Sequence, residues 1–152
     1  FEGMSNWDHP DAIDFGGLYR DLLRLKEWSE VEVMTKSSIL NPDYEKSWRI
    51  KHILKPKKII IVEWYMALVD DRIRSIFDLS IFLDIPIGEI MNRREKITYN
   101  DESEYNNKIL FPMHKKYVEP TKGVADLTID VLKNNKDGVY KAIYGELEKF
   151  LR

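Results

Sequence analysis

The spacing of apolar residues predicts a helix near the start of the chain. Apolar side chains recur at intervals of three or four residues at Phe15, Leu18, Leu22 and Leu25. This period places them on one face of an amphipathic helix, which we expect to span residues 10–28. Pro10 suits a first helical turn, because its ring holds φ near the helical value and its missing N–H donor is not needed there. Asp8 or His9 is then the expected N-cap.

Three apolar runs predict strands. Residues 57–63, Lys-Lys-Ile-Ile-Ile-Val-Glu, are too continuously β-branched for a sheet with one wet face, so we expect a strand that is buried on both sides. Residues 79–84 form a second such run, and residues 125–131 form a weaker third that fits a sheet edge. Residues 29–56 are ambiguous, since short alternations around a polar turn favour either a hairpin or an extended excursion.

Helical segments alternate with these strands. We expect short helices at residues 70–76, 86–96 and 101–117. A closing helix follows, with an apolar stripe made of Val139, Ile143, Leu147 and Phe150. Strands that alternate with helices indicate an α/β fold with three layers, in which helices cover both faces of a parallel sheet.

Length and charge narrow the class of protein. The chain has 152 residues, 43% of them hydrophobic, which is enough for one domain, residues 1–152, with its own core. The net charge of −2 argues against nucleic acid as a partner, because the chain lacks a positive field. No apolar run approaches the roughly 20 residues that cross a bilayer, and we expect a cytoplasmic protein without membrane contact. The absence of cysteine removes thiolate nucleophiles and zinc-thiolate sites.

Two predicted strands end in a carboxylate, Glu63 and Asp84. Ligands of open α/β sheets bind beyond the carboxyl ends of the strands. Carboxylates at that edge suit Mg²⁺ and its water ligands, since Mg²⁺ prefers hard oxygen donors. The alternative is that both are simply solvated residues at strand ends.

A cluster of cations ends the helix predicted at residues 86–96. Arg93, Arg94 and Lys96 lead into a polar stretch, and together they suggest a lid at about residues 92–108. Cations on such a segment can close over a transferring phosphoryl group and neutralise its charge. The alternative is that they only complement the helix dipole.

Four separate blocks of the chain resemble the uridine kinase family of P-loop kinases. The blocks are Asn-Trp-Asp-His-Pro-Asp-Ala-Ile-Asp-Phe at residues 6–15, the stretch from Lys57 to Asp84, Asn-Arg-Arg-Glu-Lys at residues 92–96, and the stretch from Phe111 to Ile129. They occur in the order and approximate spacing of that family. The resemblance covers most of the chain and rests on several independent matches.

The resemblance implies a kinase that transfers the γ-phosphoryl group of ATP, with Mg²⁺, to the 5′-hydroxyl of a pyrimidine nucleoside. Asp8, with His9 in the Asp-His-Pro block, would then bind the ribose hydroxyls, although an N-cap role for Asp8 needs no ligand. Arg93, Arg94 and Lys96 would match the basic lid that grips phosphates. Glu63 would match the acid on the Mg²⁺-ATP side of the site, and we assign no certain metal ligand.

The chain also departs from the family pattern. The family begins with a strand, a P-loop of the form GxxxxGK[ST], a helix and a second strand, and none of these is found in the sequence. We therefore expect the chain to be N-terminally incomplete and not to turn over ATP by itself. By the resemblance, the first strand would lie between residues 57–63 and 79–84. Upstream residues, a second copy of the chain or direct pairing of the two runs would have to satisfy their backbone groups.

The residues that would read the base differ as well. Met34 stands where the family has a Tyr, and Trp64 replaces the Gly that follows the strand-end acid. Three hypotheses therefore remain open. The intact protein is a uridine/cytidine-type nucleoside kinase, a catalytically inactive kinase-fold module for binding or assembly, or a kinase of the same fold for another small hydroxyl compound.

Overall fold

The computed structural model describes four stretches of the chain, residues 5–36, 41, 49–97 and 103–151. The chain forms two compact units. The first consists of Phe1–Ile13 with Trp64–Arg152, and the second of Asp14–Glu63. The prediction of a single domain over residues 1–152 stays a prediction.

The helix of the second unit begins later than the sequence pattern predicts. α1 spans Phe15–Lys26, and its N-cap is Asp14, whose Oδ1 accepts a hydrogen bond of 2.8 Å from the backbone N–H of Gly17. A Cβ at position 17 would lie against the Asp14 carboxylate, so a larger residue there would require that side chain to shift. The expected start at Pro10 is wrong, because residues Pro10–Ala12 form a separate 3-10 turn, η1, which belongs to the other unit.

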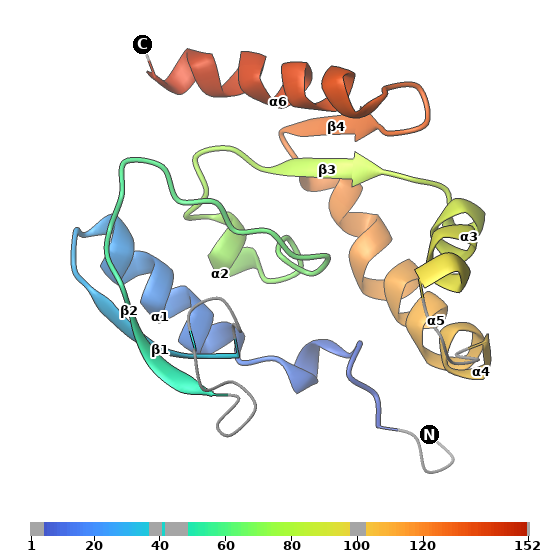
Figure 1. Ribbon diagram of the computed structural model, residues 1–152, viewed down its shortest axis with the longest axis horizontal. Helices are drawn as coiled ribbons and strands as arrows, with labels where there is room; N and C mark the ends of the chain where they lie inside the picture. Colours follow the sequence, from blue (N-terminus) through green and yellow to red (C-terminus); the bar gives the residue numbers. More distant parts are fainter. Residues whose placement is uncertain (1–4, 37–40, 42–48, 98–102, 152) are drawn as a thin grey trace. The chain divides into compact units, whose positions relative to one another are not determined.

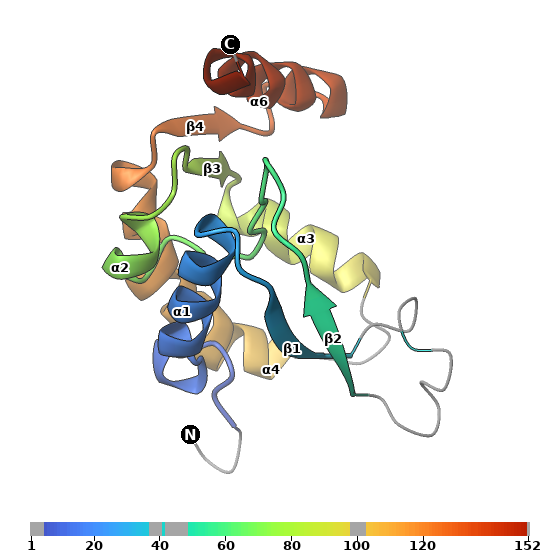
Figure 2. The same cartoon turned by 90° about the vertical axis from the view of Figure 1, so that its left-hand side faces the viewer.

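A hairpin follows α1, as one of the two alternatives predicted. β1 (Val31–Thr35) pairs antiparallel with β2 (Ile50–Leu54), with Val31 opposite Leu54 (Figure 2). Val31 is buried, and β1 packs against α1. The polar turn expected at residues 41–43 lies largely outside the described residues.

The strand predicted at residues 57–63 is not formed. The segment has no regular secondary structure, and the side chain of Ile61 is 79% exposed. A β-branched run becomes a doubly buried strand only when neighbouring strands satisfy its N–H and C=O groups. Within the described part of the chain, no strand pairs with it.

The other two predicted strands form a parallel pair in the first unit. β3 (Ile81–Asp84) lies beside β4 (Leu127–Asp130), with Ile81 opposite Leu127 (Figure 1). Asp126 Oδ2 accepts hydrogen bonds of 2.8 and 2.6 Å from the backbone N–H and the hydroxyl of Ser80, which joins the two residues that directly precede the strands. This parallel pair between helices is compatible with the predicted P-loop kinase-like α/β fold. A three-layer sheet with further strands stays a prediction.

The helices of this unit lie where the apolar spacing predicts them. They are α2 (Asp71–Arg74), α3 (Ile87–Ile97), α4 (Ser103–Tyr105), α5 (Phe111–Met113) and α6 (Lys136–Leu151). Wide helical turns, η2 (Asn106–Leu110) and η3 (His114–Val118), join α4 and α5 into one helical run that continues into the 3-10 segment η4 (Glu119–Val124). Pro112 lacks an N–H donor, which accounts for the irregular hydrogen bonding around it.

The core of this unit is built from apolar residues of several elements, namely Met66, Ala67, Leu68, Ile73, Ile109, Val118 and Ile129. Met66 and Ile73 are fully buried. The closing helix contributes less, since no α6 residue is buried and Phe150 of its predicted stripe is exposed. Among the helices in the described ranges, none is long and apolar enough to cross a membrane.

Candidate substrate site

Asp8 is a buried carboxylate that accepts hydrogen bonds from two phenol groups. Its exposed fraction is 9%. The hydroxyl of Tyr65 donates to Oδ1 at 2.8 Å, and the hydroxyl of Tyr105 donates to Oδ2. All three residues belong to the first unit, which includes the start of the chain. The site thus presents a carboxylate whose two oxygens each accept a hydroxyl donor.

Asp8 does not cap a helix. The cap of η1 is His9, whose Nδ1 accepts the backbone N–H of Asp11 at 3.2 Å, and the cap of α1 is Asp14. The N-cap alternative for Asp8 is therefore wrong, because the Asp8 carboxylate faces Tyr65 and Tyr105 instead of a helix end. A ribose-binding role for Asp8 stays a proposal.

Arg94 adds a positive charge beside this cluster. Burial and the hydrogen bond to Asp8 raise the pKa of Tyr105 to about 12, and the same two causes raise the pKa of Tyr65 further. The positive charge of Arg94 lowers both pKa values and so opposes both shifts, as the smallest of their causes. Of the three predicted lid cations, Arg94 is the one whose charge acts on the residues around Asp8.

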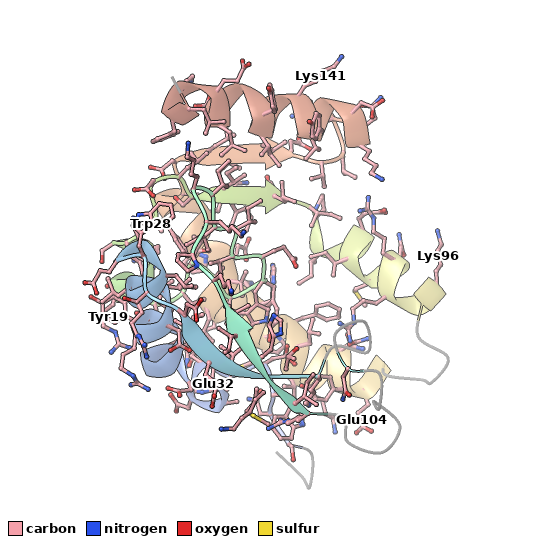
Figure 3. All side chains as sticks on the ribbon, turned by 60° about the vertical axis from the view of Figure 1, so that its left-hand side comes forward. Tyr19, Trp28, Glu32, Lys96, Glu104 and Lys141 are labelled. Atoms are coloured by element: carbon pink, nitrogen blue, oxygen red, sulfur yellow. The ribbon has the colours of Figure 1, made fainter. Side chains whose placement is uncertain are left out.

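The other two cations of α3 are turned toward solvent. Arg93 is exposed and forms an ion pair with Glu89, one turn earlier, at 2.8 Å. Lys96 stands near the end of α3 and points away from the helix (Figure 3). The positions of Arg93 and Lys96 fit the alternative in which these cations only complement the helix dipole. The lid predicted at residues 92–108 lies partly outside the described residues, and its phosphate-binding role stays a proposal.

His9 forms a second contact with the helical run. Its Nε2 lies 2.8 Å from the hydroxyl of Tyr117, with the rings edge to face at a centroid distance of 5.1 Å. Nδ1 of the same ring accepts the backbone N–H of Asp11, so both ring nitrogens of His9 have a hydrogen-bond partner. His9 is thereby held by its cap and by Tyr117, and this orients the turn that carries Asp8.

The two strand-end carboxylates are not brought together by the described contacts. Asp84 forms an ion pair with Lys122, so its charge is already compensated. Glu63 is exposed and belongs to the second unit. Among the described residues, no group of three or more His, Asp or Glu side chains could hold a metal ion. Since the sequence also lacks a phosphate loop, the described residues do not fit a complete Mg²⁺-ATP site.

The hydroxyl partners of Asp8 were not predicted as site residues. Tyr65 and Tyr105 lie 57 and 97 residues from Asp8 in the sequence. Tyr105 carries a weak signal, because it is one of two aromatic residues in an otherwise polar stretch, residues 98–107. Tyr65 carries none, since it lies two residues beyond the predicted strand end at Glu63.

The raised phenol pKa values predict a loss of stability in alkali. Unfolded tyrosines release their protons near pH 10. Folded Tyr105 keeps its proton to about pH 12, so between these values the unfolded state binds fewer protons. The free energy of unfolding should therefore fall as the pH rises through this range. Urea unfolding at stepped pH should show a shallower fall for Tyr105→Phe than for the wild type.

A control separates this effect from the titration of other groups. Tyr140 is an exposed tyrosine of α6, and Tyr140→Phe should leave the alkaline slope unchanged. An equal slope in Tyr105→Phe and wild-type protein would show that the Asp8 contact does not hold the phenol proton.

Comparison with known proteins identifies the family. The model of the phosphoribulokinase/uridine kinase family matches residues 1–137. The uridine kinase of Proteus mirabilis (strain HI4320) is 34% identical over 131 residues, which cover 82% of this chain and 60% of that protein. The uridine kinase of Salmonella paratyphi B is 30% identical over 132 residues with the same coverage. The chain spans 60% of the length of these curated relatives, and it belongs to the phosphoribulokinase/uridine kinase family.

Proposed function

We propose that the protein carrying this chain is a nucleoside kinase of the uridine/cytidine type, and that this chain supplies the part that binds the nucleoside. The observation that carries the proposal is the buried Asp8 carboxylate, which accepts one hydroxyl donor on each oxygen. A ribose offers two adjacent hydroxyl donors. The relatives in the same family that bear the name uridine kinase support a nucleoside as the acceptor.

In this proposal the chain orients the acceptor. Asp8 accepts the two vicinal ribose hydroxyls, and His9 holds the turn that carries it through Tyr117. Fixing the sugar in this way orients its 5′-hydroxyl. A hydroxyl held in the reactive geometry reacts faster with the phosphoryl group than one that must first find this orientation. The proposal gives Arg94, whose positive charge acts on Tyr65 and Tyr105, the role of neutralising a phosphoryl group near the sugar.

The nucleotide side of the site is assigned by family alone. ATP would supply the γ-phosphoryl group, with Mg²⁺ to neutralise its charge. Glu63 remains the proposed residue on the Mg²⁺-ATP side, and Arg93 and Lys96 remain proposed lid cations. Because the sequence holds no GxxxxGK[ST] motif, residues 1–152 alone should not turn over ATP. A cytoplasmic location and a homo-oligomeric assembly are part of the proposal as well.

One observation favours an inactive binding module as the second candidate. Trp64 replaces a small residue of the family pattern, and its ring packs edge to face on Tyr65 at a centroid distance of 5.3 Å. The hydroxyl of Tyr65 in turn donates a hydrogen bond to Asp8 Oδ1. In a module without turnover, this aromatic pair would keep the sugar site closed permanently.

A substrate panel tests the proposal. The full-length gene product that contains residues 1–152 should release ADP with uridine or cytidine and Mg²⁺-ATP, and the rate without a nucleoside should be at least about tenfold lower. Turnover of a different hydroxyl compound with no response to nucleosides would favour the alternative kinase. Nucleoside binding without any ADP release would favour the inactive module. The absence of both ADP release and nucleoside binding would contradict the proposal.

A further inference from the structure

The hydroxyl of Tyr65 occupies the acceptor that a sugar hydroxyl would need. Asp8 is 9% exposed, so a ligand cannot reach its carboxylate in this arrangement unless a neighbour moves. Oδ1 is covered by Tyr65 and Oδ2 by Tyr105. A phenol and a sugar hydroxyl are alternative donors to the same oxygen. The described state is therefore closed toward the sugar.

The two tyrosines are not held equally. Tyr105 is part of a helical run, and its hydroxyl also receives the backbone N–H of Trp7. Tyr65 lies in a turn outside any helix or strand, and it is 45% exposed. Its ring contacts Trp64, the preceding residue in the same segment. Tyr65 can thus leave Asp8 by a side-chain rotation into solvent, whereas Tyr105 is fixed on two sides.

We propose that Tyr65 is a gate residue, whose hydroxyl closes the Asp8 carboxylate in the absence of ligand and is displaced by a sugar hydroxyl. This inference rests on the proposed function, because it assumes that Asp8 accepts a sugar. The exchange keeps the carboxylate oxygen satisfied at every stage, since the outgoing phenol is replaced by the incoming hydroxyl. Tyr105 stays in place on Oδ2. Because a carboxylate oxygen can accept two hydrogen bonds, Oδ2 then accepts the adjacent sugar hydroxyl beside that of Tyr105.

The gate lowers the apparent affinity for the nucleoside. A ligand that binds only the open state has its affinity reduced by the fraction of molecules that are open. Removing the phenol hydroxyl removes the competitor. Tyr65→Phe should therefore bind uridine about tenfold more tightly than wild-type protein, which corresponds to about 1.4 kcal/mol. This value is near the lower end of the net free energy that a hydrogen bond to a charged group contributes.

The affinity is measured by isothermal titration with uridine of the full-length gene product that contains residues 1–152, for the wild type, Tyr65→Phe and a control. Tyr140→Phe removes a hydroxyl from an exposed tyrosine of α6 and should leave the affinity unchanged. Tighter binding by Tyr65→Phe alone supports the gate. Equal or weaker binding by Tyr65→Phe, with uridine still bound by the wild type, overturns the gate and leaves the proposed function standing. If neither the wild type nor Tyr65→Phe binds uridine, both the gate and the proposed function are overturned.

A spectroscopic readout keeps the test independent of the variant's folding. Wild-type protein with ¹³Cζ-labelled tyrosine should show a shift of the Tyr65 signal toward that of a solvated phenol when uridine is added. The Tyr105 signal should keep the shift of a phenol bonded to a carboxylate. A Tyr65 signal that does not respond to saturating uridine overturns the gate, because a purely structural Tyr65 would stay on Asp8.

Discussion

Replacing Asp8 by asparagine is expected to weaken uridine binding about 100-fold, or about 2.7 kcal/mol. Asparagine keeps the size of the side chain and removes its charge. One carboxylate oxygen becomes an NH₂ group, which cannot accept a hydroxyl donor. The sugar therefore loses one hydrogen bond entirely and keeps the other only in a weaker, neutral form. Isothermal titration of Asp8→Asn and wild-type protein with uridine measures the difference.

The control is a carboxylate of the same unit that has no role in the site. Asp137 is exposed in the first turn of α6, and Asp137→Asn should bind uridine with wild-type affinity. Asp8→Asn also replaces a buried charge, so its thermal unfolding must be recorded beside its affinity. Lower stability with unchanged affinity would mean that Asp8 only holds Tyr65 and Tyr105 in place.

Replacing Ile73 by alanine is expected to lower the free energy of unfolding by about 3 kcal/mol. Ile73 is fully buried in α2, a helix of one turn that begins at the cap residue Asp70. The truncation removes apolar contacts and leaves a cavity that so short an element can fill only in part. The free energy of unfolding of a domain is typically about 5–15 kcal/mol, so the expected loss is a large share of it. Urea unfolding monitored by far-UV circular dichroism gives the value.

The matched control for this change is another isoleucine. Ile61 is largely exposed in the segment where the sequence predicts a buried strand. Ile61→Ala should change the free energy of unfolding by less than about 0.5 kcal/mol. A loss at Ile61 as large as that at Ile73 would mean that residues 57–63 are buried after all, as the sequence pattern predicts.

The spacing of apolar residues is sufficient to predict an element that is stabilised within itself or by a neighbour close in the sequence. The apolar period placed α1 correctly except for its start, where Asp14 is the N-cap and accepts the backbone N–H of Gly17. The alternation in residues 29–56 allowed a hairpin, and β1 and β2 form one. The runs at 79–84 and 125–131 contain β3 and β4.

Local pattern failed where burial depends on distant partners. Residues 57–63 have the composition of a buried strand, but composition cannot supply the neighbours that satisfy its backbone. The same limit applies to the site. The Asp-His-Pro block singled out Asp8 and His9, whereas Tyr65, Tyr105 and Tyr117 reach them across 57, 97 and 108 residues. No period or spacing in a sequence reports contacts of that range.

The function proposed for the Asp8 carboxylate is to accept two adjacent sugar hydroxyls. The most direct measurement is the affinity of wild-type and Asp8→Asn protein for uridine and for 2′,3′-dideoxyuridine, which lacks both hydroxyls. The wild type should prefer uridine by about 100-fold, and Asp8→Asn should lose most of that preference. Equal affinity of the wild type for the two ligands, or a preference that survives in Asp8→Asn, would contradict the claim.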